Sequence, residues 1–293
     1  MKRRRITRGR IQRDFCEHKG FTLIEVIVVI GIISLMVGII IPMVYRVWES
    51  QEIDTTKERM QKIKDAMIGN PSHIGNGTRS NFGFVGDLGQ LPPDLDALIG
   101  YGSYGPYLSG GIDPGSFKKD AWNNDLIYTY LTDAYSRRES AVIRSHGSDN
   151  SPGGTGTAED ILLTVVTNEV FPASSISCNV LIRYMTAPSS TFNANITVHI
   201  MFKNGEGADR EQTFSSPVTV TENEGNPQNN YSFGLSSALS PKLPVGVSRI
   251  WADINRDSSG NLLGVPAAGP VNFIAVNDRV STIYAGNLSV SSP

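Results

Sequence analysis

One uninterrupted apolar segment near the N-terminus limits what this chain can fold into. Residues 21–41 read FTLIEVIVVIGIISLMVGIII, in which Glu25 is the one charged side chain. As a helix, such a segment rises about 32 Å at 1.5 Å per residue, which is enough to cross the hydrocarbon core of a bilayer. The segment therefore predicts a membrane-spanning helix.

The charge distribution around this segment predicts its orientation. Residues 1–20 carry eight Lys or Arg side chains against two acidic ones, a net charge of +6; the whole chain carries −2, so residues 21–293 carry −8. A basic end of this kind stays on the cytoplasmic side of a membrane. An ordinary secretory signal is shorter and ends in small residues, whereas here the apolar run continues past Pro42 to Trp48.

Overall composition excludes several classes of protein. The apolar content of 40% is that of a folded chain, and a net charge of −2 argues against a nucleic-acid binder. Two cysteines, Cys16 and Cys178, are too few for a disulfide scaffold or a structural zinc site. We expect Cys178 to be a buried strand residue, with a thiol paired between subunits as the alternative.

Glu25 is a carboxylate in the apolar run, where an ionised side chain costs about 3 kcal/mol unless it finds a partner. Cleavage between Gly20 and Phe21 would free an α-amine at the start of the helix, and in a helical polymer the carboxylate of one subunit can neutralise the amine of its neighbour. The alternative is that Glu25 merely lies near the lipid headgroups.

The string Lys19-Gly20-Phe21-Thr22-Leu23-Ile24-Glu25, with Pro42 as the twenty-second residue after the Gly, resembles the class III signal of type IV pilins and type II secretion pseudopilins. The resemblance implies a prepilin peptidase/methyltransferase that cuts after Gly20 and methylates Phe21. It assigns assembly to Glu25 and Pro42. It also implies other pilin-like subunits and an inner-membrane assembly platform as partners, and a single-pass inner-membrane protein with periplasmic globular domains that ends in a periplasmic or surface filament.

Beyond the apolar run, the helix is expected to continue to residue 68. Apolar or semi-apolar residues recur at helical spacing and charged residues lie off this line, which is typical of an amphipathic helix; the line consists of Ile53, Thr56, Met60, Ile63 and Met67. Gly69-Asn70-Pro71 predicts its end. Pro42 and nearby Gly38 are expected to bend or locally melt it.

Residues 69–164 resemble the globular domain of major pseudopilins, and the whole resemblance covers about residues 15–163. The segment DAWNNDLIYTY (120–130) predicts a turn and then a strand, with residues 141–144 as the antiparallel partner. It is similar to a DPWGNPY-like turn of that family, from which Ala121 and Asn124-Asp125 depart. Residues 69–116 are rich in turn-forming Gly and Pro, with a short helix expected at 93–99.

The same resemblance implies a calcium-binding loop at 145–160. Calcium prefers six to eight oxygen ligands on a flexible loop, and the candidates are Asp149, Glu159 and Asp160, with Ser145 in addition. A solvated polar loop is the alternative. A hydrolase triad at residues 145–149 is disfavoured, because side chains so close along the chain rarely converge.

Residues 165–293 predict a β-sandwich of immunoglobulin-like or transthyretin-like kind, because seven short strand-like runs alternate with turns. Asn204-Gly205 between two runs predicts a hairpin. Asp253, Asn255 and Asp257 have the spacing of a second calcium loop, with an ordinary turn as the alternative. His73 and His199 lack metal-ligand spacing and are interpreted as structural or solvated.

Together these features predict an α+β chain in four parts: a leader (1–20), an N-terminal helix (21–68, with 21–41 transmembrane), a pseudopilin-like domain with a small antiparallel sheet (69–164) and a C-terminal β-sandwich (165–293). We expect a structural subunit of a type II secretion pseudopilus or type IV pilus-like filament, and not an enzyme. The alternative is a minor pilin whose sandwich is an adhesin or ligand-binding module.

Overall fold

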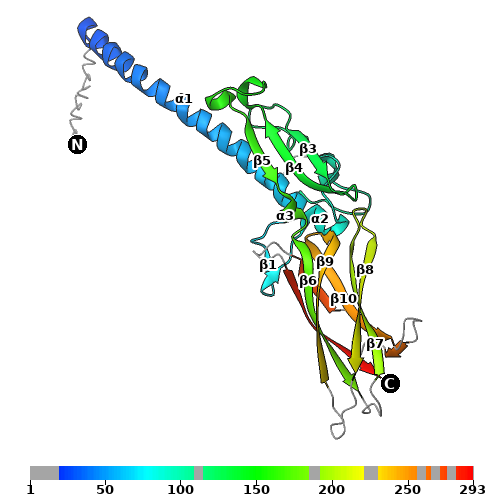
Figure 1. Ribbon diagram of the computed structural model, residues 1–293. Helices are drawn as coiled ribbons and strands as arrows, with labels where there is room; N and C mark the ends of the chain where they lie inside the picture. The colour runs from blue at the N-terminus through cyan, green and yellow to red at the C-terminus, as the bar shows by residue number, and fades with distance from the viewer. Residues whose placement is uncertain are drawn as a thin grey trace, which may run out of the picture. The chain divides into compact units, whose positions relative to one another are not determined.

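The computed structural model describes residues 20–108, 115–184, 192–220, 230–255, 262–264, 271–275 and 282–292 (Figure 1). By its internal contacts the chain divides into two compact units, Met1–Ser50 and Gln51–Pro293. Of the predicted leader, only Gly20 falls within the described residues.

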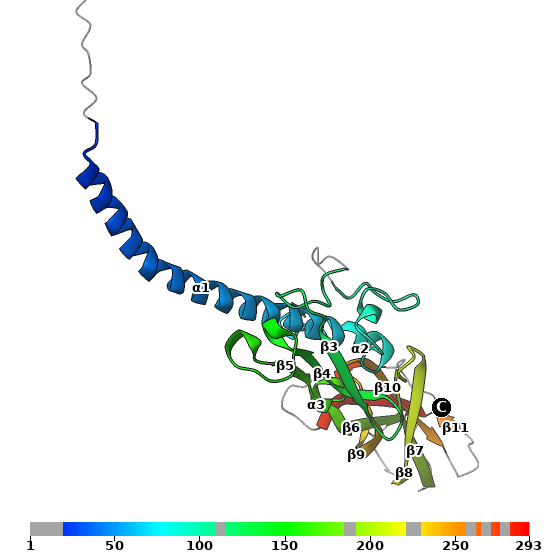
Figure 2. The ribbon, with the colours of Figure 1, turned by 90° about the horizontal axis from the view of Figure 1, so that it is seen from above.

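The first unit contains the apolar start of helix α1 (Leu23–Ile68). Every residue from 20 to 50 is exposed, and α1 is long and apolar enough to cross a membrane. Helix α1 is continuous through Gly38 and Pro42, as its ribbon in Figure 2 shows, so of the two effects expected there, bending or local melting, melting does not occur. A proline removes one backbone donor, and the rest of the hydrogen-bond ladder is sufficient to maintain the helix.

The second part of α1 is amphipathic, as its sequence predicted. Its buried residues are Thr56, Met60, Ile63, Ala66, Met67 and Ile68. The helix ends before Gly69, whose φ of +79° favours glycine, and this confirms the predicted end.

After α1 the chain forms short elements: strands β1 (Ile74–Gly75) and β2 (Thr78–Arg79), helix α2 (Gly83–Leu88) and a 3₁₀ helix (Asp96–Leu98). The helix expected at 93–99 is therefore only a single 3₁₀ turn, in which Asp94 accepts a hydrogen bond from the Ala97 N–H at 2.9 Å. Helix α2 was not expected in so glycine-rich a segment. It forms because Phe84, Val85 and Leu88 bury one apolar face.

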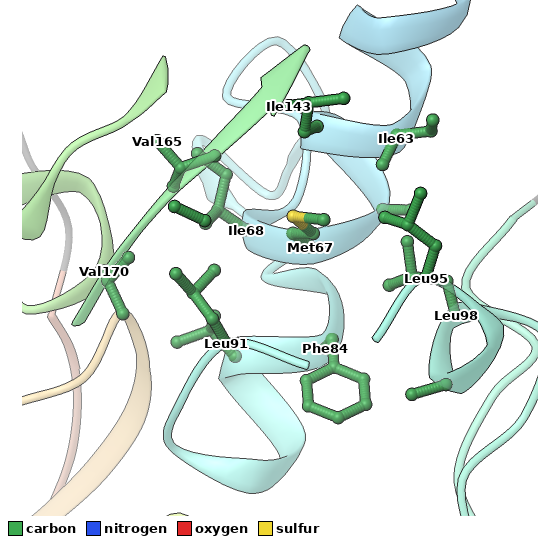
Figure 3. Packing of buried hydrophobic residues seen from close by; sticks show 14 of the residues in the cluster. Ile63, Met67, Ile68, Phe84, Leu91, Leu95, Leu98, Ile143, Val165 and Val170 are labelled. Atoms are coloured by element: carbon green, nitrogen blue, oxygen red, sulfur yellow. The ribbon is translucent and has the colours of Figure 1, made fainter. Parts of the chain in front are cut away.

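Three strands form the small antiparallel sheet in the order β3 (Ile127–Thr132), β4 (Arg138–Ser145), β5 (Ile161–Val165). Ile127 pairs with Arg144, which confirms the predicted hairpin, while β5 adds a strand that was not expected. Short 3₁₀ turns lie between β4 and β5 at Gly147–Asp149 and Gly156–Ala158, and helix α3 (Thr167–Val170) follows β5. Figure 3 shows apolar side chains of β4, β5 and α3 meeting those of α1 and α2 in one core.

The C-terminal part consists of two sheets around a second core. One sheet has the order β11-β10-β7-β8, with β12 also paired to β10; the other has the order β13-β6-β9. The strands are β6 (Ala173–Tyr184), β7 (Phe192–Lys203), β8 (Asp209–Val220), β9 (Asn230–Leu243), β10 (Gly246–Asn255), β11 (Leu262–Gly264), β12 (Val271–Ala275) and β13 (Thr282–Ser292). The core includes Ile176 of β6, Val198 of β7 and Ile250 of β10.

This arrangement confirms the α+β fold class with a C-terminal β domain. The hairpin expected at Asn204-Gly205 joins β7 and β8, and the Asn204 N–H donates to Ala208 O at 3.0 Å. Cys178 is buried in β6 as expected, and this burial raises the pKa of its thiol to about 11. The parallel pairing of β13 with β6 was not foreseen.

Within the second unit, hydrogen bonds join the sandwich to the segment that precedes it. The Gln90 side chain donates to Gly205 O at 2.7 Å, and the Val245 N–H donates to Val170 O at 2.8 Å. Arg137, 5% exposed, donates to Lys242 O at 3.0 Å and lies 4.0 Å from the centre of the Phe171 ring. The sandwich and the small sheet therefore belong to one packed body.

Candidate functional sites

The predicted cleavage bond between Gly20 and Phe21 lies immediately before α1, in backbone that is not helical. Phe21 is 81% exposed, and among the described residues, its chain neighbours aside, no atom lies within 4 Å of the position that a Cβ on Gly20 would take. Exposed, irregular backbone of this kind is what a peptidase can bind. The geometry of the bond is therefore compatible with processing, which stays a prediction.

Thr22 and Glu25 form a capping box at the start of α1. The Glu25 N–H donates to Thr22 Oγ1 at 3.3 Å, and the Thr22 N–H donates to Glu25 Oε2 at 3.4 Å. This reciprocal pair satisfies two backbone donors that a helix start otherwise leaves unpaired. Sequence reasoning missed this role of Glu25, although the Thr-x-x-Glu spacing at 22–25 was a signal for it.

The carboxylate of Glu25 forms no ion pair with the residues that the structure describes. Around it and through Pro42, α1 exposes large apolar side chains such as Ile24, Val28 and Leu35, each more than half exposed. An apolar surface of this size is stable only against lipid or against other apolar helices. The first unit can therefore act both as an anchor and as a surface for helix bundling.

Asp120 connects α1, the 120–124 turn and the end of β4. Its carboxylate, 1% exposed, accepts the Ser145 hydroxyl at 2.7 Å and the Asn124 N–H at 2.8 Å. From α1, Arg59 donates to Asp120 O at 2.7 Å, and Thr56 Oγ1 accepts the Ala121 N–H at 3.1 Å. Sequence analysis interpreted Asp120 only as the start of a turn, because its partners lie far away along the chain.

The candidate calcium loop folds back on itself between β4 and β5. A Cβ on Gly147 would lie 2.4 Å from Thr157 O, so the two limbs of the loop touch. Asp160 Oδ1 accepts hydrogen bonds from His146 Nδ1 at 2.9 Å and from the Gly153 N–H at 3.1 Å. The bond from His146 lowers the pKa of the Asp160 carboxyl.

The four candidate ligands of this loop have different surroundings. Asp149 and Glu159 are exposed, and Asp149 Oδ1 accepts the Ser151 N–H at 3.1 Å. Ser145 is buried, and its hydroxyl is bonded to Asp120 and to the Gly147 N–H. Among the described residues, no three His, Cys, Asp or Glu side chains gather as metal ligands do. Calcium binding by this loop stays a prediction.

The second candidate calcium set lies at the end of β10. Asp253 is a strand residue whose Oδ2 accepts a hydrogen bond from His199 Nε2 at 3.1 Å. The other ring nitrogen of His199 bonds to Glu211, and the imidazole stacks on Trp251 with centroids 5.0 Å apart. The side chain of Asn255, the last residue of β10, and the whole of Asp257 lie outside what the structure describes.

The fold and these sites define an α+β protein with an exposed apolar N-terminal helix that is long enough to span a membrane. The prokaryotic N-terminal methylation motif, which is the prepilin signal of type IV pilin-like proteins, matches residues 17–41 of this chain. No curated protein and no solved structure matches the chain significantly. The chain therefore carries a type IV pilin-like prepilin signal on a long apolar helix.

Proposed function

We propose that this chain is a structural subunit of a type II secretion pseudopilus or a related type IV pilus-like filament that supports protein secretion. In this proposal a prepilin peptidase/methyltransferase cuts after Gly20 and methylates Phe21. The inner-membrane assembly platform then brings the subunit to the growing filament. The observation that carries the proposal is the position of Glu25, a lone carboxylate within the exposed apolar start of α1.

Assembly follows from the surfaces of the first unit. On assembly, the exposed apolar side chains of α1 move from lipid into contact with the helices of other subunits. The new α-amine of Phe21 then pairs with the Glu25 carboxylate of a neighbouring subunit. Removing one partner of such a charge pair leaves the other charge uncompensated in an apolar environment, which costs about 3–5 kcal/mol. Glu25 therefore sets the position of each incoming subunit along the filament axis.

The capping box allows a test that separates the charge of Glu25 from its hydrogen bonds. Glu25→Gln keeps an oxygen that can accept the Thr22 N–H but removes the charge. Thr22→Val removes the capping hydroxyl but keeps the charge. Glu49→Gln removes a charge from an exposed position farther along α1 and serves as the matched control.

Each variant is expressed in cells that lack the native gene, and filaments are sheared from the cells and quantified. Mass spectrometry should show that the native chain and all three variants begin at a methylated Phe21. Glu25→Gln should be absent from filaments, while Thr22→Val and Glu49→Gln should be present. Native filament yield from Glu25→Gln would contradict the assembly role, and an uncut native chain would contradict the processing role. Comparison of secreted proteins with and without the gene tests the secretion role.

A further inference from the structure

The second unit contains a cleft of about 710 Å³ that the proposed filament role does not use. Residues 73–87 and 106–107 line one side of it. Strands β7, β8 and β10 of the sandwich line the other, with the outward face of their sheet. Small-molecule sites generally measure about 300–1,000 Å³. The cleft therefore has the size of a ligand site.

Among the described side chains that line the cleft, Arg249 is the cation without an ion-pair partner and Asp87 is the carboxylate without one. Lys203 pairs with Asp209 at 2.9 Å, and Asp87 accepts the Tyr107 hydroxyl at 2.9 Å. The side chain of Arg249, exposed on β10, forms no ion pair or hydrogen bond with the residues that the structure describes. A planar guanidinium of this kind matches the two oxygens of a carboxylate.

Aromatic and amide groups in the cleft are held in fixed positions. The Tyr107 ring packs against the edge of Phe84 with centroids 5.3 Å apart, and burial together with the bond to Asp87 raises the pKa of its hydroxyl. Asn81 Oδ1 accepts the Gly83 N–H at 3.1 Å, which leaves the Asn81 amide N–H groups to donate. Aromatic ring faces can pack against the apolar C–H faces of a sugar, and nearby amide N–H groups can donate to its hydroxyls.

The strands that line the cleft favour a saccharide over a peptide. β7 is paired on one side with β8 and on the other with β10, and β10 is paired with β7 and β12. Peptides often bind by adding a strand to a free sheet edge. Because β7 and β10 are paired on both sides along the cleft, they present side chains to a ligand and no free backbone. Among the described strands of this sheet β8 has an unpaired edge, but Asp209 is the one β8 residue in the lining.

We propose that this cleft binds a carboxylate-bearing saccharide, whose carboxylate pairs with Arg249 while its ring lies against Tyr107 and its hydroxyls accept from Asn81. The inference goes beyond the proposed function. It concerns the globular unit alone and holds whether or not the chain enters a filament.

The test uses the full chain purified from membranes in detergent, with calorimetric titration of trigalacturonic acid. Galactotriose serves as the neutral saccharide and triglutamate as the acidic peptide. Arg249→Gln removes the available cation, and Arg210→Gln, an exposed position on β8 outside the cleft, is the matched control. Thermal unfolding of both variants shows whether they are folded.

We expect trigalacturonic acid to bind the native chain and the other two probes to bind at least tenfold more weakly. Arg249→Gln should lose about tenfold or more in affinity, as is usual for a charged hydrogen bond, and Arg210→Gln should not change it. Three results would overturn the proposal: no binding of trigalacturonic acid at millimolar concentration, equal affinity in Arg249→Gln, or equal binding of triglutamate, which would indicate a peptide site.

Discussion

The Ser145 hydroxyl donates to the Asp120 carboxylate at 2.7 Å, and both side chains are buried. This bond joins the end of β4 to the 120–124 turn, which Thr56 and Arg59 connect to α1. The helix that carries the prepilin signal is thus attached to the small sheet by polar contacts as well as by its apolar face. Asp120 is the residue on which these contacts converge.

Replacing Asp120 with Ala should lower the free energy of unfolding by about 2 kcal/mol or more, because the buried Ser145 hydroxyl and the partly buried Asn124 N–H both lose their acceptor. Asp125→Ala is the control, since its side chain is 82% exposed and pairs with Lys119 at the surface. That variant should lose less than about 1 kcal/mol. Denaturant unfolding of the mature chain in detergent measures both, and equal losses would contradict this role of Asp120.

A glycine after α2 should be essential for docking of the sandwich. Gly89 has a φ of +87°, and a Cβ on it would lie 2.4 Å from Lys203 O. Gly77 has a similar φ of +78° but open space around it, so Gly77→Ala isolates the cost of backbone strain. Gly89→Ala should destabilise the chain by about 1–3 kcal/mol more than Gly77→Ala does, because backbone must also move.

Limited proteolysis locates the part of the Gly89→Ala variant that unfolds first. Cuts should appear first around the β7–β8 hairpin, which contacts Gly89 and Gln90. If Gly89→Ala and Gly77→Ala have the same free energy of unfolding and the same rate of proteolysis, the close approach of Gly89 to β7 does not contribute to stability.

The elements that the sequence predicted well are those with local signals. The end of α1 follows from Gly69, the amphipathic part of α1 from its 3.6-residue period, and the β7–β8 hairpin from Asn204-Gly205. Helix α2 was missed because Gly83 and Gly86 lower helix propensity, and the packing of Phe84 in the core outweighs this.

Contacts between distant segments could not be predicted from one sequence. Asp253 was interpreted as the first ligand of a candidate calcium loop. Its bond to His199 depends on the register between β10 and β7 that pairs Trp251 with His199. A shift of β10 by one residue would turn Asp253 to the face of the sheet opposite His199. The parallel pairing of β13 with β6 has no local signal either.

In acid, the free energy of unfolding should depend on the protonation of Asp160, because His146 donates a hydrogen bond to its carboxylate. Because the folded pKa of Asp160 lies below its ordinary value of 3.8, its contribution is fully present above pH 3.8 and is lost as the pH falls through the lower folded value. His146→Gln removes the largest cause of the shift. We therefore expect unfolding free energy to fall less steeply below pH 3.8 in His146→Gln than in the native chain, and identical slopes would contradict the role of His146.

Calcium should stabilise the second unit if the 145–160 loop binds it. An ion that binds only the folded state adds about 2.7 kcal/mol at a hundredfold excess over its Kd. Asp160→Ala removes the carboxylate that closes the loop and should abolish the rise in unfolding temperature on adding calcium to chelator-treated protein. Glu206→Ala, an exposed carboxylate on the β7–β8 hairpin, is the control and should keep the rise.

The same measurement separates the two candidate loops. Changing both Asp253 and Asp257 to Asn leaves the 145–160 loop intact, so a calcium-dependent rise that persists in this variant and disappears in Asp160→Ala assigns the ion to that loop. The reverse pattern assigns it to the end of β10. Because Asp160→Ala also loses its bonds to His146 and Gly153, the informative quantity is the calcium-dependent change within each variant. No rise in the native chain at millimolar calcium would rule out both sites.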